Sequence, residues 1–172
     1  MILAIDVYYI DDKAKSVGIL FNGWQDETPF GIIADYRDNV TPYQSGEFYL
    51  RELPCIMPLL EKIDLSKVDI IVVDGHVYLD DGKIGLGGHL YQALNQSIPI
   101  IGVAKNPFFT NNNQVKEVFR GNSKHPLYIT SVGIDAELAA SNVRAMAGKH
   151  RMPTLLSFLD QQTKLFKNEC RS

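Results

Sequence analysis

The sequence predicts an α/β fold with a mixed sheet of five to six strands, in which an antiparallel meander leads into parallel strands and helices flank the sheet. Three observations predict this fold. Short runs of β-forming residues with short polar connections open the chain, which is typical of antiparallel strands. Two near-continuous apolar runs follow, and such runs are typical of parallel strands buried on both faces. Segments with helical periodicity separate and follow these runs.

The elements can be placed in order along the chain. The meander is predicted from strands at residues 2–9, 16–24 and 29–36, with a polar turn at residues 11–13. Apolar residues at helical spacing predict a helix over residues 47–63, in which two prolines indicate a kink or a late start. The later predicted elements are strand 68–73, short helix 89–95, strand 98–104, strand 127–131, helix 135–147 and helix 154–167.

This order of elements is the layout of the ribonuclease H-like fold, and a length of 172 residues suits one domain over residues 1–172. The net charge of −3 argues against a protein that holds nucleic acid by charge alone. It is compatible with carboxylates gathered around metal ions, because the cation then sets the local field. Cys55 and Cys170 lack metal-ligand spacing, which favours a reduced, cytoplasmic protein. We expect neither a signal peptide nor a membrane span.

Four carboxylates fall where a metal site could form. Asp6 interrupts the apolar first strand, and Glu52 lies early in the first long helix. Asp74 ends the most hydrophobic strand, and Asp135 opens a later helix. Taken singly, these acids also fit an edge position, a surface ion pair, an Asp-Gly turn and a helix N-cap. Taken together they can converge, and converging carboxylates repel unless cations neutralise them.

Oxygen ligands of this kind suit Mg²⁺ or Mn²⁺. Two such ions can hold the attacking water and the leaving oxygen during phosphodiester hydrolysis. The four acids therefore predict a metal-dependent enzyme that acts on phosphate esters.

Two segments resemble a known family. Residues 42–54 (PYQSGEFYLRELP) are similar to the "P-Y-I-P-G-F-L-S-F-R-E-x-P" segment of the endonuclease V family, and residues 99–107 (PIIGVAKNP) are similar to its "P-T-I-G-V-A-K" strand. Shorter matches are residues 5–7 with its first catalytic strand, residues 73–75 with its "D-G-x-G" turn, Gly85 and His89 beyond that turn, and residues 128–133 with its "Y-V-S-x-G" stretch. The resemblance covers nearly the whole chain and identifies it as a short, divergent member.

The resemblance implies a metal-dependent endonuclease of DNA-repair type. It would cleave on the 3′ side of a deaminated base, deoxyinosine in DNA or inosine in RNA, with Mg²⁺ or Mn²⁺ as its cofactor. Asp6, Glu52 and Asp74 would bind the metal. Lys105 would lie near the scissile phosphate as a cation, and would complete the catalytic residues.

The resemblance also implies how the damaged base is held. Tyr43 would be a wedge that fills the gap left when the nucleotide rotates out of the stack, since an aromatic ring replaces lost stacking. Gly46, Phe48, Gly75 and Gly85 would line the hypoxanthine pocket. Glycines suit this role because they let the backbone approach a flat base closely.

The chain departs from the family at two places. The family usually has His-Pro-Arg after its "D-G-x-G" turn, and the aligned residues here are Asp80, Asp81 and Gly82. Where the family has a histidine after "Y-V-S-x-G", this chain has Ile134 followed by Asp135. Asp135 could supply a metal ligand in its place, as a helix-borne acid does in ribonuclease H.

Two alternatives to cleavage therefore stay open. The protein could bind inosine-containing nucleic acid without cutting it, or it could be a metal-dependent hydrolase of small nucleotides. The sequence does not decide between DNA and RNA, between Mg²⁺ and Mn²⁺, or which protein partners and oligomeric state apply.

Overall fold

The computed structural model describes residues 1–40, 42, 48–79, 83–108 and 114–169. Its strands are β1 (Ile2–Ile10), β2 (Lys13–Phe21), β3 (Gly31–Arg37), β4 (Ile70–Asp74), β5 (Ile100–Ala104), β6 (Lys116–Val118) and β7 (Leu127–Val132). Its helices are α1 (Phe48–Leu60), the 3-10 helix η1 (Leu65–Lys67), α2 (Leu86–Ala93), α3 (Ala136–Ala145), α4 (Thr154–Lys164) and α5 (Phe166–Glu169).

The strands of the described residues form one seven-stranded sheet in the order β3-β2-β1-β4-β5-β7-β6. Strands β1, β4 and β5 run parallel to one another, and the other neighbours are antiparallel. The predicted mixed sheet of the ribonuclease H-like fold is therefore confirmed. The prediction of five to six strands is corrected to seven, because the three-residue edge strand β6 is too short to show a periodic pattern.

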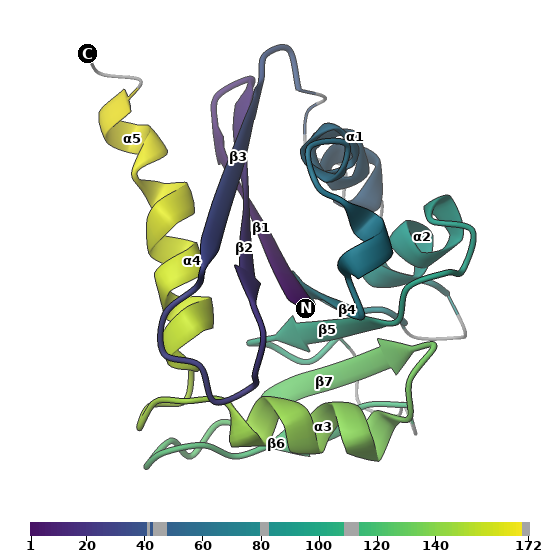
Figure 1. Cartoon of the computed structure of the whole chain (residues 1–172), viewed down its shortest axis with the longest axis vertical. Helices are drawn as coiled ribbons and strands as arrows, with labels where there is room; N and C mark the ends of the chain where they lie inside the picture. The colour runs from purple at the N-terminus through teal and green to yellow at the C-terminus, as the bar shows by residue number, and fades with distance from the viewer. Residues whose placement is uncertain (41, 43–47, 80–82, 109–113, 170–172) are drawn as a thin grey trace.

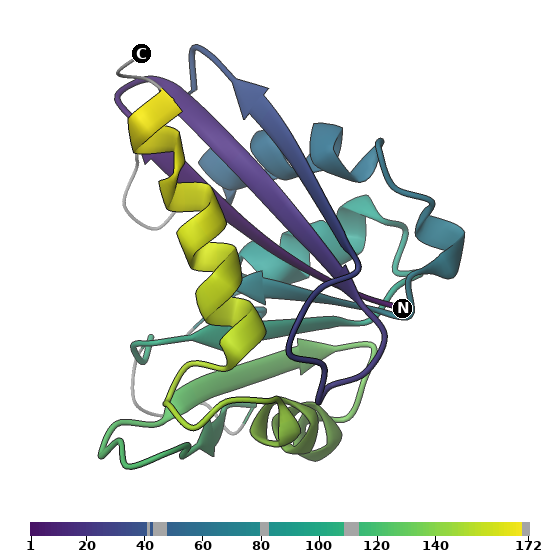
Figure 2. The same ribbon diagram turned by 60° about the vertical axis from the view of Figure 1, so that its left-hand side comes forward.

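Helices cover both faces of this sheet, as Figures 1 and 2 show. Helices α1 and α2 pack on one face, where they enclose the core that contains Leu3 and Ile5 of β1. Helices α3 and α4 pack on the other face, over the core that contains Ile2 and Ala4. The strict alternation along β1 therefore assigns odd positions to the α1 face and even positions to the α4 face.

Helix α1 contains both predicted prolines, Pro54 and Pro58, and continues through them. Because Pro58 has no backbone N–H, the carbonyl of Pro54 cannot accept the usual helical hydrogen bond. The guanidinium of Arg37, at the end of β3, donates to that carbonyl at 2.5 Å instead. This contact ties the helix that carries Glu52 to the meander.

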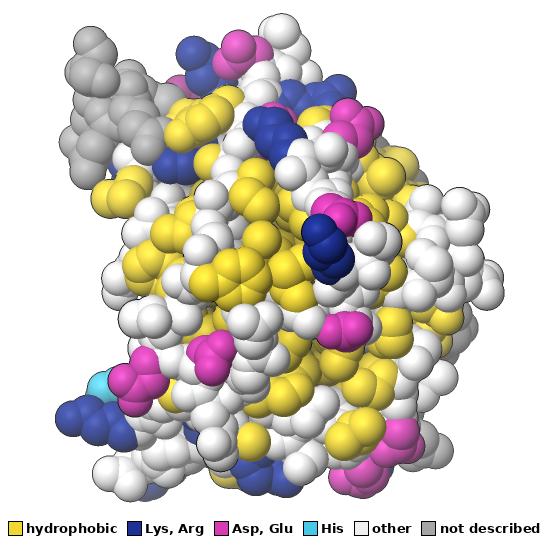
Figure 3. Space-filling model, viewed as in Figure 1, with side chains coloured by type: hydrophobic (Ala, Val, Ile, Leu, Met, Phe, Trp, Pro, Cys, Tyr) yellow, Lys and Arg dark blue, Asp and Glu magenta, His cyan; other side chains and the backbone are white. Residues whose placement is uncertain are grey.

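Apolar side chains are exposed over the face formed by β3 and α4, as the space-filling view shows (Figure 3). Phe30, Ile32 and Tyr36 are each at least half exposed, and Leu165 follows α4. Lys62 donates to the carbonyl of Ala34 in β3 at 2.9 Å, and a charged side chain of this kind discourages pairing along an edge strand. Within the described residues, no helix is both long and apolar enough to cross a membrane.

Candidate functional site

Asp6 and Asp74 lie side by side at the carboxyl ends of two parallel strands. The register pairs Ile5 of β1 with Val73 of β4, so the next residue of each strand is an aspartate. Asp6 shares the α4 face with Ala4, by the alternation of β1. In open α/β sheets, the carboxyl ends of parallel strands are the usual place for a binding site.

Lys105 joins these acids from the neighbouring strand. Val103 of β5 is paired with Asp74, and Lys105 stands two residues further along the same face. The three charged residues line one hollow under α4. The full lining is Ile5, Asp6, Val72, Val73, Asp74, Val103, Lys105, Met152, Leu156, Leu159 and Asp160.

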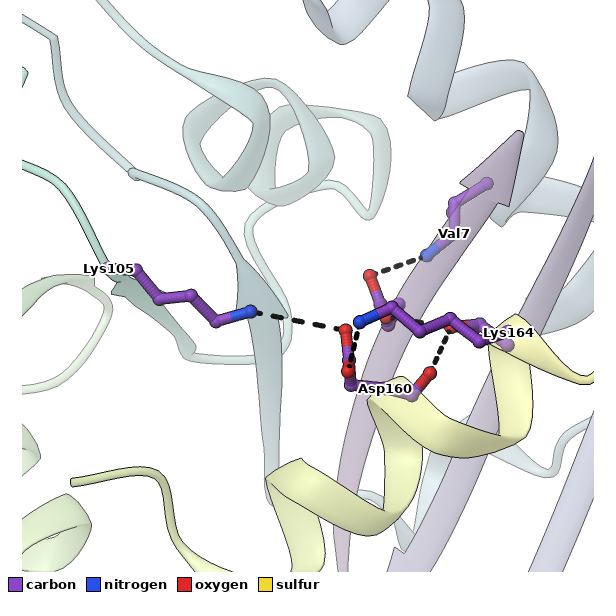
Figure 4. Close-up of polar contacts among 6 residues, drawn as sticks. Val7, Lys105, Asp160 and Lys164 are labelled. Atoms are coloured by element: carbon purple, nitrogen blue, oxygen red, sulfur yellow. Dashed lines mark hydrogen bonds and ion pairs between the residues drawn. The ribbon is translucent and has the colours of Figure 1, made fainter. Parts of the chain in front are cut away.

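Helix α4 completes the group with Asp160, which the sequence analysis does not single out. Lys164, one turn later, donates to Asp160 Oδ2 at 2.6 Å, and Lys105 Nζ lies 4.0 Å from Asp160 Oδ1 (Figure 4). The Thr163 hydroxyl lies 3.1 Å from Asp6 Oδ2, and the Val7 amide donates to Asp6 Oδ1 at 2.9 Å. Asp160 lines the hollow together with the apolar residues Leu156 and Leu159 of the same helix. An acid on the apolar side of an amphipathic helix is the sequence signal that could have identified it.

Glu52 of α1 belongs to the same electrostatic group. Its side chain is only 6% exposed, although glutamate is rarely buried without a charged or metal partner. Burial, followed by the charges of Asp6 and Asp74, raises the pKa of Glu52 well above its usual range. The structure therefore brings Glu52 into interaction with both strand acids.

The pKa values of the strand acids are also raised. Burial, then the charge of Asp74, raises the pKa of Asp6 to about 6, against the opposing effect of its hydrogen bonds from Thr163 and Val7. Loss of solvent is the main cause that raises the pKa of Asp74, while the Lys105 ammonium opposes the shift. Several carboxyl groups thus disfavour one another's charged form, which a cation would reverse.

The donor chemistry fits a hard divalent cation, because each acidic group offers carboxylate oxygens. Among the described residues, no three His, Cys, Asp or Glu side chains are gathered tightly enough to form a ready metal centre.

Asp135 lies apart from this group. Its carboxylate caps α3, where Asp135 Oδ1 accepts from the Leu138 amide at 3.0 Å. It also lines a separate hollow with Tyr78, Lys116 and Ser131. The structure therefore does not bring Asp135 to Asp6 and Asp74, and the helix N-cap accounts for its position. The helix-borne acid that shares a hollow with Asp6 and Asp74 is Asp160.

Gly75 and Gly85, two of the expected base contacts, lie on adjoining stretches of backbone. Gly75 follows Asp74 with φ of +124°, and an added Cβ there would meet open space. An added Cβ at Gly85 would lie 2.4 Å from the His76 carbonyl oxygen, and the Gly85 amide donates to the Val77 carbonyl at 2.7 Å. Gly75 thus directly follows one of the acids, and the close approach of the His76 backbone leaves no room for a side chain at Gly85. Contact of these two glycines with a base stays a prediction.

Of the other expected base contacts, the structure describes only the backbone of Phe48. Tyr43 and Gly46 lie outside the described residues, and so do Asp80, Asp81 and Gly82. Phe48 begins α1, but its side chain lies outside the described part. One turn before Glu52, Tyr49 stacks on His89 of α2, with ring centroids 3.5 Å apart. This stack joins the start of α1 to the helix that follows Gly85.

Comparison with known structures supports the fold. Endonuclease V of Streptomyces avermitilis superposes with a TM-score of 0.77 at 22% identity, over 99% of this chain and 82% of that chain. Endonuclease V of Ciona intestinalis, in complex with DNA containing an inosine followed by a ribo-adenosine, superposes with a TM-score of 0.80 at 17% identity, over 98% of this chain and 86% of that chain. At these identities the likeness concerns the fold.

Sequence comparison goes further. Endonuclease V of Trichormus variabilis is 29% identical over 140 residues, which cover 77% of this chain but only 60% of the relative. The chain thus spans less than two thirds of the length of this relative. The Endonuclease V family model matches residues 1–128. The chain therefore belongs to the Endonuclease V family.

Proposed function

We propose that this protein is a metal-dependent endonuclease that cleaves a phosphodiester bond on the 3′ side of a deaminated base, deoxyinosine in DNA or inosine in RNA. The observation that carries the proposal is the register of β1 and β4, which sets Asp6 beside Asp74, together with Asp160 of α4 across the same hollow. Lys105 stands at the rim of that group. Acids and a lysine in this arrangement suit the binding of cations and phosphate.

Asp6 and Asp74 would hold the metal, with Glu52 and Asp160 as further oxygen donors. When bound, Mg²⁺ or Mn²⁺ supplies a Lewis acid and a water of lowered pKa as the nucleophile. Lys105, whose side chain is 41% exposed, would bind a non-bridging oxygen of the scissile phosphate and stabilise its developing charge.

Base recognition would fall to the glycine backbone next to the acids. Gly75 and Gly85 would border the hypoxanthine, where the absence of side chains lets a flat base lie close to the backbone. Tyr43, together with Gly46 and Phe48 in the matching family segment, would hold the neighbouring bases once the damaged one has left the stack.

A cleavage assay tests the proposal. The protein is incubated with Mg²⁺ or with Mn²⁺ and labelled DNA or RNA strands that contain a single inosine. We expect metal-dependent cutting on the 3′ side of the inosine. Asp74→Asn, which keeps the shape of the side chain but removes a charged donor, should lower the rate by at least about a hundredfold, as loss of a key electrostatic group does.

Matched variants separate the two helix-borne acids. Asp160→Asn should lower the rate strongly, whereas Asp135→Asn should keep it, since asparagine also caps a helix. Retained activity in Asp160→Asn and lost activity in Asp135→Asn would contradict the proposed ligand set. No cutting of either polymer would favour inosine-specific binding without cleavage, and cutting of mononucleotides alone would favour a small-nucleotide hydrolase.

The site residues come from the sheet and from helices on both of its faces, which supports a single catalytic domain over residues 1–172. The buried Cys55 is a free thiol, and we place the enzyme in a reducing compartment, the cytoplasm. We propose no membrane partner.

A further inference from the structure

Asp160 is approached by two ammonium groups from different elements. Lys164 reaches it from one turn later on α4, with Nζ 2.6 Å from Oδ2. Lys105 reaches it from the end of β5, with Nζ 4.0 Å from Oδ1 (Figure 4). The Lys164 side chain is 51% exposed and that of Asp160 is 31% exposed, so this pair stands at the open side of the hollow. Lys164 is therefore free to move without repacking the core.

The charge of Lys164 acts on more than its direct partner. Its hydrogen bond to Asp160, and then the charges of Asp160 and Asp6, raise the pKa of Lys164. Lys164 is also among the groups that oppose the raised pKa of Asp74. The ammonium thus occupies a position where several acids favour a positive charge, and a metal ion is drawn to the same position.

We infer that Lys164 is a tethered counter-ion that gives up Asp160 to the bound metal and then binds a phosphate oxygen of the nucleic acid. The inference rests on the proposed function, because it takes the metal to bind at Asp6, Asp74 and Asp160. It makes Lys164, beside Lys105, a second residue that binds the substrate. It also means that metal binding increases the affinity for nucleic acid.

The physical basis is competition for one carboxylate. A divalent cation held by several carboxylates interacts more strongly with Asp160 than one solvent-exposed ammonium does, since exposed ion pairs contribute little. Once released, the ammonium remains beside the site on a flexible four-carbon stem. A strand that enters the hollow brings phosphate oxygens to that place, and Lys164 can then neutralise one of them.

This arrangement couples the two ligands. Metal binding frees Lys164 for phosphate, so the metal increases the affinity for nucleic acid through Lys164 as well as directly. By linkage, nucleic acid increases the affinity for metal by the same factor. An ion pair with only a structural role would give no such coupling. Lys67 of η1 and Asp64, which caps the start of that helix, lie 2.9 Å apart and form such a pair away from the site.

Metal binding gives the first test. Titration calorimetry with Mn²⁺ alone compares the wild type, Lys164→Gln and the control Lys67→Gln. We expect Lys164→Gln to bind Mn²⁺ about two- to fivefold more tightly, the size expected when an exposed competing ion pair is removed. Lys67→Gln should match the wild type. Equal affinity in Lys164→Gln and the wild type would overturn the inference alone, whereas a wild type that binds no Mn²⁺ would overturn the proposed metal function as well.

Nucleic-acid binding gives the second test, which a general charge effect cannot imitate. Fluorescence anisotropy measures the affinity for a single strand with one deoxyinosine, in EDTA and in Ca²⁺. Lys164→Gln should match the wild type in EDTA and bind more weakly than it in Ca²⁺, with a log–log salt slope lower by about one. Asp160→Asn should bind more tightly than the wild type in EDTA, because it frees Lys164.

Lys164→Gln in EDTA decides whether total charge explains these changes, because a general charge effect would weaken its binding as much in EDTA as in Ca²⁺. The double variant Asp160→Asn with Lys164→Gln keeps the wild-type net charge and should match the wild type in EDTA. If Lys164→Gln loses as much affinity in EDTA as in Ca²⁺, the inference is wrong.

Discussion

The side-chain hydroxyl of Thr163 lies 3.1 Å from a carboxylate oxygen of Asp6, across 157 residues of sequence. As a donor, the hydroxyl favours the charged form of Asp6 and opposes the burial that raises its pKa to about 6. The same contact fastens α4 to β1, which aligns Asp160 with the strand acids. This one hydrogen bond thus helps to position α4 and also favours the charged form of Asp6.

Thr163→Val should therefore shift the acid limb of the metal-dependent pH–rate profile to higher pH. Without the hydroxyl, the pKa of Asp6 rises further, and less of the enzyme has the charged carboxylate at a given pH. The free energy of unfolding should fall by about 1 kcal/mol, measured by urea denaturation. Thr163→Ser, which keeps the hydroxyl, should restore the profile. An unchanged acid limb in Thr163→Val would contradict this role.

The stability of the metal-free protein should fall as pH rises from about 4 to about 6. The pKa of Asp6 is raised from 3.8 to about 6 in the folded protein, so the folded state binds more protons than the unfolded state in this window. The stabilisation is full below the unfolded pKa and is lost through the folded pKa. Asp6→Asn should be more stable at pH 7 by roughly 1–3 kcal/mol, with a flatter pH dependence.

Asp26 provides the opposite control for that measurement. The amides of Gly23 and Asn22 donate to its carboxylate and lower its pKa, so the charged form stabilises the fold above the unfolded pKa. Asp26→Asn should lower stability at pH 7. Urea unfolding curves at several pH values give both results, and a gain in both variants would show that the Asp6 effect is not specific to its environment.

Arg120→Met should lower the free energy of unfolding by about 3 kcal/mol or more, because several backbone carbonyls would lose the buried guanidinium that donates to them. Arg120 is 6% exposed and donates to the carbonyls of Met146, Gly148 and His150 in the segment before α4. Arg120→Lys should rescue little, since an ammonium lacks the planar fork. The exposed Arg144→Met should be near neutral in the same thermal-unfolding experiment.

Gly85→Ala should reduce both stability and cleavage. Its new Cβ would lie 2.4 Å from the His76 carbonyl oxygen, so the chain beside the proposed base site must move. We expect a loss of about 1–3 kcal/mol together with a raised KM for inosine-containing strands. In the control Gly31→Ala, the new Cβ meets only the Leu20 side chain, at 3.2 Å, and activity should persist. A normal KM in Gly85→Ala would remove this glycine from the base site.

The sheet could be predicted because its strands carry strong period-two or continuous apolar patterns. The bounds of the central strands β4 and β5 differ from the predicted ranges 68–73 and 98–104 by at most two residues. The ends of a strand are harder to predict where the conformation of the adjoining turn determines them. Strand β2 begins at Lys13, inside the predicted turn, because Asp11 adopts a positive φ of 53° and lets the hairpin close early.

The site was harder to predict than the sheet. Asp6 and Asp74 could be identified because an acid in an apolar strand is conspicuous, and parallel pairing then makes them neighbours. Asp160 stands in an otherwise ordinary amphipathic helix, and its proximity to Asp6 depends on how α4 crosses the sheet. Asp135 was misleading because its local sequence fits a ligand and a helix cap equally well. Whether the named acids bind metal stays a prediction.

The site draws on both ends of the chain, since Asp6 belongs to β1 and Asp160 to α4, the eleven-residue helix that ends at Lys164. During synthesis the strand acids leave the ribosome long before their partner helix. A nascent or prematurely terminated chain that lacks residues beyond Pro153 would carry the sheet without Thr163, Asp160 or Lys164. Such fragments are expected to be inert, so that the proposed cleavage would begin only after α4 has docked on the sheet.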